Sequence, residues 1–228
     1  MIKIIYIEQR RMGDSREFWV RRWRRHGGFA MQFAEFWDPV RIYVQNDCVA
    51  DCSAFAGADP DFGGVGELLY DDLASCQASL ATPNMPTIVA DGSQVFARQK
   101  AVHLVTEARN LIGTRPASCR VFAYASRPEG MDQAEFRARL DESFAASASA
   151  FTLPPVHMSI AHNVEPRGAH ESVMDFSFHA MDDAVQGHAA WVQAVQSDAF
   201  LADALDRDPL KVATHSCIIY DTDNFGEG

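Results

Sequence analysis

The strongest constraint on this 228-residue chain is that its residue pattern occurs twice. Residues 4–18 resemble residues 122–136, which lie 118 positions later. In the same order, residues 40–44 resemble 156–160, residues 67–69 resemble 175–177, and His103 corresponds to His215. A repeat of this length indicates two copies of one supersecondary unit. We therefore expect two domains, 1–112 and 117–228, joined through Gly113-Thr114-Arg115-Pro116.

Each copy shows the same order of periodicities. Alternating apolar runs predict strands, and apolar stripes at a spacing of 3.6 residues predict helices. Strands are expected near 2–8, 39–47, 64–70, 100–109, 119–126, 155–163, 172–180 and 211–220. Helices are expected near 15–37 with a break at Gly27-Gly28, 71–81, 132–148 and 181–206, with a further turn or two near 86–97.

The resulting order is βαββαβ twice, which predicts an α+β fold. Such a unit forms a four-stranded antiparallel sheet with its helices on one face. The bare face of the sheet is apolar and must be covered. We expect two fused ferredoxin-like units whose sheets pack into an α+β barrel, with a cavity between the sheets.

The net charge of −11 argues against a nucleic-acid or anionic-membrane binder, which needs a basic face. Residues 1–41 nevertheless hold nine of the 20 basic side chains. Arg21, Arg24 and Arg25 are predicted to lie on the solvent side of the first helix, opposite Trp19 and Trp23. The basic region therefore needs no anionic partner to explain it.

Cysteine usage and hydropathy favour a cytoplasmic protein. The five cysteines are an odd number and are scattered, which is typical of reduced thiols. Cys48 and Cys52 lack a second pair at zinc-site spacing, so no metal is expected. The apolar run 4–7 is too short for a signal peptide, and no stretch approaches a membrane span.

Strand alternation predicts which polar residues share one face of each sheet. In the first copy these are Tyr6, Glu8, Arg41, Tyr43, Gln45, Glu67, His103 and Glu107. In the second they are Arg120, Tyr124, His157, Ser159, Asp175, Ser177, His179 and His215. Singly, each is better explained as a strand-end residue in water or a hydrogen-bonded buried group. Together they suggest a small-molecule site.

His26 is the most specific candidate because it follows the Trp19 and Trp23 stripe. We expect it to end the helix just before Gly27-Gly28, with its imidazole at the rim of the cavity. A histidine there can accept and donate a proton near neutral pH. A core histidine bonded to a carbonyl or carboxylate explains the pattern equally well. At the offset of 118, its counterpart is Phe144, so only the first copy keeps the polar group.

The opening of the chain resembles the signature of EthD-like proteins of the dimeric α+β-barrel superfamily. The resemblance rests on residues 3–6, 10–11, 15–18, Trp23 and His26-Gly27, and is specific over residues 1–46. It implies a ferredoxin-like barrel that is usually free of cofactors and hosts varied small-molecule chemistry. In a related methylmuconolactone methylisomerase, a histidine matching His26 is implicated in proton transfer. That enzyme also uses a cysteine on the third strand, where this chain offers Glu67.

The leading hypothesis is a cofactor-independent acid–base enzyme, of the lyase, isomerase, dehydratase or cyclase type. It would act on a small hydrophobic aromatic or lactone-like molecule. His26 would be the general acid and base, with Glu67 orienting it or serving as a second base. The expected substrate-binding residues are Tyr6, Trp23, Arg41, Tyr43 and His103.

Two alternatives remain open from the sequence. One is an oxidoreductase of the same fold, either a cofactor-free monooxygenase or a haem protein, since eight histidines allow an axial ligand. The other is a non-catalytic binding module. Gly63-Gly64-Val65-Gly66 lacks the context of a phosphate-binding loop, and residues 57–66 are interpreted as a loop over the pocket. We expect no cofactor, no nucleic-acid or membrane partner, and a monomer or homodimer.

Overall fold

The computed structural model describes residues 1–97, 99–165 and 168–221, apart from the side chains of residues 216–219. By its internal contacts the chain divides into two compact units. Unit 1 consists of Met1–Cys48, Asp61–Val105 and the described residues of Ile218–Gly228, and unit 2 of Val49–Pro60 and Thr106–Cys217. Strands β4 (Val102–Ile112) and β8 (Leu210–Asp221) contribute residues to both units.

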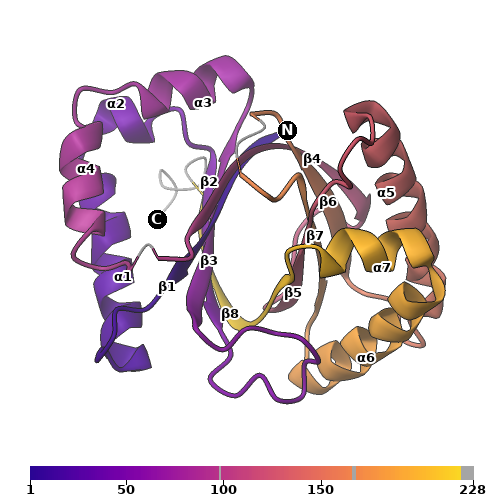
Figure 1. Cartoon of the computed structure of the whole chain (residues 1–228). Helices are drawn as coiled ribbons and strands as arrows, with labels where there is room; N and C mark the ends of the chain where they lie inside the picture. Colours follow the sequence, from indigo (N-terminus) through magenta and orange to yellow (C-terminus); the bar gives the residue numbers. More distant parts are fainter. Residues whose placement is uncertain (98, 166–167, 222–228) are drawn as a thin grey trace. The chain divides into compact units, whose positions relative to one another are not determined.

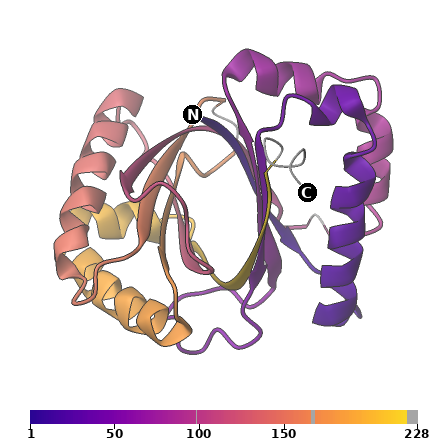
Figure 2. The same cartoon turned by 180° about the vertical axis from the view of Figure 1, so that it is seen from behind.

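Unit 1 is a sheet with its helices on one face (Figures 1 and 2). Its elements are β1 (Ile2–Gln9), α1 (Arg16–Ala30), α2 (Ala34–Trp37), β2 (Ile42–Cys48), β3 (Phe62–Tyr70), α3 (Leu73–Leu80), α4 (Met85–Gly92) and the start of β4. Strand β3 lies between β1 and β2 and is antiparallel to both. Leu68 of β3 pairs with Ile4 on one side and with Tyr43 on the other.

Unit 2 repeats this arrangement. Its elements are the end of β4, β5 (Cys119–Ala125), α5 (Gln133–Ser147), the 3-10 turn Ala148–Ala150, β6 (His157–Asn163), β7 (Ser172–Phe178), α6 (Met181–Ser197), α7 (Ala199–Asp206) and the start of β8. Strand β7 lies between β5 and β6, while β8 pairs with β5 and β4 with β6.

The hydrogen-bonded strand order is β1-β3-β2-β8-β5-β7-β6-β4, and it closes as an antiparallel barrel. This order confirms the predicted fold class of two fused βαββαβ units. Nearly every predicted strand and helix is present, with ends shifted by a few residues. The domain boundaries at residues 112 and 117 stay a prediction.

The first helix differs from its predicted form. Ser15 caps it by accepting a hydrogen bond from the backbone nitrogen of Phe18 at 3.2 Å. The helix then continues through Gly27 to Ala30, so the expected break at Gly27-Gly28 is wrong. Gly27 is needed for close packing instead of a turn, because a Cβ there would lie 3.0 Å from Tyr43 Cε1. His26 therefore sits inside a continuous helix.

Strand β3 begins at Phe62, within the region interpreted as a loop. Its glycines make room for aromatic rings of neighbouring elements. A Cβ at Gly66 would lie 2.0 Å from Tyr6 Cζ, and one at Gly64 would lie 2.4 Å from Trp23 Cζ3. The glycine-rich stretch is therefore part of the core.

The repeat offset between the two first helices also differs from the prediction. The buried residues of α1 are Trp19, Trp23, Gly27 and Ala30, and those of α5 are Phe136, Leu140, Phe144 and Ser147. Each pair is 117 positions apart, by subtraction. Phe144 is thus the counterpart of Gly27, and the assignment of Phe144 to His26 is wrong by one residue. The counterpart of His26 is Ser143.

The cysteines whose side chains the structure describes, Cys48, Cys52, Cys76 and Cys119, are free thiols. The side chain of Cys217 lies outside the described residues. Within the described chain, no helix has the length and apolar character needed to cross a membrane.

We predict that Gly66→Ala lowers the free energy of unfolding by about 3 kcal/mol, because the new methyl group overlaps the Tyr6 ring. Gly28→Ala in α1 is the control, since a Cβ there meets nothing within 4 Å. It should leave stability unchanged or raise it by up to about 1 kcal/mol. Urea unfolding of both variants measures the difference, and equal effects would contradict the packing argument.

Candidate functional site

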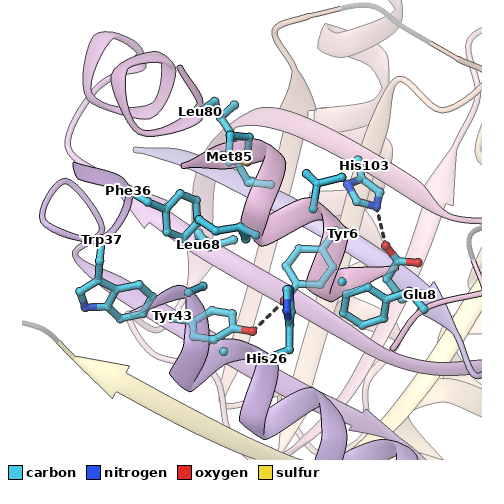
Figure 3. Close-up of a pocket in the computed structure, with 17 residues that line it drawn as sticks. Tyr6, Glu8, His26, Phe36, Trp37, Tyr43, Leu68, Leu80, Met85 and His103 are labelled. Atoms are coloured by element: carbon cyan, nitrogen blue, oxygen red, sulfur yellow. Dashed lines mark hydrogen bonds and ion pairs between the residues drawn. The ribbon is translucent and has the colours of Figure 1, made fainter. Parts of the chain in front are cut away.

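Unit 1 contains a cavity of about 170 Å³ between its sheet and its helices. Figure 3 shows apolar side chains at one end of this pocket, among them Phe36, Leu80 and Met85. Polar groups gather at the other end: Tyr6, Glu8, His26, Tyr43 and His103. We expected the site between the two sheets, whereas this pocket lies on the helix-covered face of the sheet of unit 1.

His26 is held by a carboxylate from α4. Its Nδ1 lies 2.7 Å from Asp91 Oδ2, and Arg22 Nη2 donates to Asp91 Oδ1 at 2.9 Å. The Phe96 ring stands perpendicular to the imidazole, with centroids 5.4 Å apart. A neutral His26 that donates from Nδ1 to Asp91 carries its lone pair on Nε2, which is the tautomer of a general base.

Asp91 is suited to this role because it stays ionised. Burial raises the pKa of its carboxyl group, but the hydrogen bonds from Arg22 and His26 outweigh that effect, and the pKa lies below its ordinary value. The carboxylate can therefore stabilise a positive charge on His26 when the imidazole takes up a proton.

A pair of phenols lies beside His26. The hydroxyls of Tyr6 and Tyr43 are 2.8 Å apart. Trp23 Nε1 donates to the Tyr6 oxygen at 3.3 Å, and Gln45 Nε2 donates to the Tyr43 oxygen at 2.6 Å. Burial is the main cause that raises the pKa of Tyr43 to about 12 and the pKa of Tyr6 well above its ordinary value. Both phenols are therefore protonated at neutral pH.

Counting donors shows what this pair can do. Two phenols carry two O–H groups, and a single hydrogen bond joins them. Both nitrogen partners act as donors, so they consume no phenolic proton. One O–H group therefore remains to donate to an acceptor in the pocket.

Arg24 fixes the orientation of Gln45. Its Nη1 donates to Gln45 Oε1 at 3.0 Å and its Nη2 lies 2.6 Å from Asp47 Oδ2. The guanidinium also stacks over the Trp23 ring at 5.1 Å. With its oxygen held by Arg24, the Gln45 amide presents its nitrogen to Tyr43. The prediction that Arg24 faces solvent is wrong, whereas Arg21 and Arg25 are exposed.

A second histidine and carboxylate stand at another edge of the pocket. His103 Nε2 lies 2.7 Å from Glu8 Oε1. Glu8 is 1% exposed, while the His103 side chain is 56% exposed. The tilted Tyr6 and His103 rings are 5.7 Å apart, so this pair adjoins the phenols.

Three of the predicted site residues lie elsewhere. Glu67 is buried on the opposite face of the sheet, 3.5 Å from Lys3 Nζ and 3.1 Å from Asn46 Nδ2. Arg41 is exposed and pairs with Asp71. Trp23 is fully buried behind Tyr6 and reaches the pocket only through that phenol.

The histidine candidates of the second copy are separate from this pocket. His157 is buried on β6 with its Nδ1 3.3 Å from Asp175 Oδ1, and His179 and His215 are exposed. Within residues 1–97, 99–165 and 168–221, no group of three or more His, Cys, Asp or Glu side chains could hold a metal ion.

The sequence interpretation missed Asp91, Arg22 and Phe96 as parts of the site. Asp91 lies 65 positions after His26, and the contact joins α1 to α4, which no local periodicity encodes. The available signal was one acidic residue in the mostly apolar stretch 85–96.

Comparison with known proteins supports the resemblance. Residues 11–100 match the family model of the EthD domain, which confirms the similarity over the part of the chain that carries His26, Tyr43 and Asp91. A search of curated proteins gave no match.

Several solved structures share the fold at low sequence identity. An anthrone oxidase-like protein aligns with a TM-score of 0.63 at 9% identity, covering 96% of this chain and 92% of its own. A chlorite dismutase variant from Candidatus Nitrospira defluvii gives 0.51 at 14%, covering 93% and 90%. A protein provisionally named as a monooxygenase from Lactobacillus acidophilus NCFM gives 0.50 at 12%, covering 96% and 99%.

We predict that Asp91→Asn lowers the free energy of unfolding by about 1–2 kcal/mol at neutral pH, because two hydrogen bonds lose their charge. The pKa of Asp91 is lower in the folded chain, so its stabilisation is complete above the ordinary carboxyl value of about 4. That stabilisation is lost as the pH falls through the folded value. Urea unfolding across this pH range should show that the difference in the free energy of unfolding between wild type and variant becomes smaller in acid.

Asp71→Asn is the matched control for this measurement. Its exposed pair with Arg41 should contribute less than about 0.5 kcal/mol at any pH. If the difference in the free energy of unfolding between wild type and Asp91→Asn stays constant with pH, the ionised carboxylate is not what stabilises the fold.

Proposed function

We propose that the pocket of unit 1 is the active site of a cofactor-independent enzyme that moves a proton on a small apolar molecule. The observation that carries this proposal is the 2.7 Å contact between His26 Nδ1 and Asp91 Oδ2 beside a phenol pair in an apolar pocket. A base, its orienting carboxylate and an oxyanion donor are the parts that such chemistry needs.

In the proposed reaction, His26 Nε2 takes a proton from an acidic C–H or O–H group of the substrate. The electron pair left behind moves onto the substrate oxygen. That oxygen accepts a hydrogen bond from the spare phenolic O–H group of the Tyr6 and Tyr43 pair. Asp91 stabilises the imidazolium. Return of the proton to another carbon completes an isomerisation, and its transfer to a leaving group completes an elimination, so no proton or electron pair is lost.

The size of the pocket supports a small aromatic or lactone-like substrate. An apolar cavity of about 150 Å³ accommodates benzene, and this one measures about 170 Å³. The free thiols of Cys48, Cys52, Cys76 and Cys119 support a reducing compartment, so we propose that the protein acts in the cytoplasm. We propose that it acts as a monomer or homodimer.

A cofactor-free oxygenase is the second candidate, because its reaction also begins with the removal of a proton from the substrate by His26. The carbanion would then react with O₂, and the names of the structural neighbours favour this direction. For anthrone the balanced outcome is anthraquinone and water. An oxygen electrode with anthrone as the substrate tests it, with oxygen uptake lost in His26→Ala as the supporting result.

Haem does not fit the described pocket. Its macrocycle contains four pyrrole rings and is much larger than the cavity of about 170 Å³. We therefore derive no step through haem. A non-catalytic module would bind aromatic ligands and turn none of them over, so the assays below also decide that alternative.

We predict that His26→Ala lowers kcat/KM for ring opening of nitrobenzisoxazole by about 10²–10⁴-fold. In this reaction a base removes the carbon-bound proton, the N–O bond breaks, and a coloured cyanonitrophenolate forms without a cofactor. Absorbance of the phenolate measures the rate. Glu67→Gln is the control, because Glu67 is a buried carboxylate on the opposite face of the same sheet. Equal rates in wild type and His26→Ala would exclude His26 as the base.

We predict that Tyr43→Phe lowers kcat for the same reaction by about 10–100-fold, because the Tyr6 hydroxyl must then donate to the developing phenolate oxygen without the second phenol, whose hydrogen bond strengthens and positions the donor. Tyr70→Phe is the matched control, since Tyr70 is 1% exposed and its hydroxyl contacts Ser79 outside the pocket. A larger effect of Tyr70→Phe than of Tyr43→Phe would mean that the phenols act through folding alone.

A further inference from the structure

One half of the pocket is lined by apolar side chains. Beyond the phenols, its walls come from Phe36 of α2, Leu68 of β3, and Met85 and Ile88 of α4. The polar groups all lie at the opposite end, as Figure 3 shows for His26, Tyr43, Tyr6 and His103. A ligand that fills both ends must itself be amphipathic.

The apolar end also opens to the surface. Leu80, the last residue of α3, is 38% exposed, and Val89 of α4 is 40% exposed. Both belong to the small set of large hydrophobic side chains that are exposed among the described residues, and both line the pocket. Apolar side chains at the mouth of a cavity extend its hydrophobic wall to the solvent boundary.

From these observations we infer that the substrate is an aromatic ring bearing an oxygen function and an alkyl chain. The oxygen lies on the phenol pair, and the chain runs past Leu68, Phe36 and Met85 towards the exposed side chains of Leu80 and Val89. This inference rests on the proposed function for the position of the ring. It adds the second half of the ligand and the direction in which it leaves the pocket.

An open apolar channel has a distinct signature in a homologous series. Each buried methylene contributes about 0.8 kcal/mol, which corresponds to about a fourfold change in Kd. Affinity should therefore rise with chain length and level off once the chain reaches Leu80 and Val89. In a closed cavity, affinity would instead fall sharply when the chain exceeds the available space.

The experiment is calorimetric titration of the full chain with phenol and with its para-ethyl, para-butyl, para-hexyl and para-octyl derivatives. We expect Kd to fall by about 15-fold for each two methylenes added and then to reach a plateau. Leu80→Asp should reduce the gain from the longer chains by at least tenfold while leaving the Kd of phenol within about twofold. Leu153→Asp is the matched control, because Leu153 is 50% exposed and does not line the pocket.

Three outcomes would overturn the inference: a Kd independent of chain length, a sharp loss of affinity for the longer chains, or equal effects of Leu80→Asp and Leu153→Asp. A change of oligomeric state in Leu80→Asp, seen by light scattering, would assign the exposed residues to a contact between chains and also overturn it. The assay with His26→Ala decides the proposed function separately. If His26→Ala loses activity but Kd does not depend on chain length, only the alkyl chain of the substrate is contradicted. If Kd depends on chain length but His26→Ala keeps its activity, only the proposed chemistry is contradicted.

Discussion

The phenols of Tyr6 and Tyr43 project from strands that are not neighbours, because β3 runs between β1 and β2. They can meet because Gly66 of β3 pairs directly with Tyr6 and has no side chain. The Tyr6 ring occupies the position that a Cβ of Gly66 would take, and its hydroxyl reaches Tyr43. The hydrogen bonds that Trp23 and Gln45 donate to the phenols, and the spare phenolic proton, all depend on this crossing.

The same glycines explain why the sequence predicted the strands but placed Glu67 in the site. Alternation identifies the two faces of a strand only where successive side chains differ. On β3 the positions that face the helices include Gly64, Gly66 and Leu68, so the glycines leave the first half of the strand without a readable face. Glu67 is the first charged residue after them, and the pattern assigned it to the wrong face. Its neighbours Lys3 and Asn46 show its true position.

His26 could be predicted because it follows two tryptophans at helical spacing, and the helix is a local property of the sequence. Its environment could not be predicted in the same way. Asp91 comes from another helix, and Gly27 is used for contact with Tyr43 and Gln45 instead of ending α1. A glycine pair in a sequence allows a turn or a close approach. Only the packing of α1 on β2 decides between these uses.

Unit 2 shows that the site is a set of linked substitutions. With the helices aligned at 117 positions and the strands aligned through their pairing partners, Phe144 and Met174 stand where unit 1 has Gly27 and Gly66. Ala123, Met158 and Ile160 stand where unit 1 has Tyr6, Tyr43 and Gln45. All five are buried in the apolar core of unit 2.

Large side chains thus replace the glycines and apolar ones replace the polar groups, so the helices of unit 2 pack on a filled surface. A histidine introduced at Ser143 would lack both the cavity and the phenols. The chemistry proposed for unit 1 therefore requires the missing volume at Gly27 and Gly66 as much as it requires His26 itself.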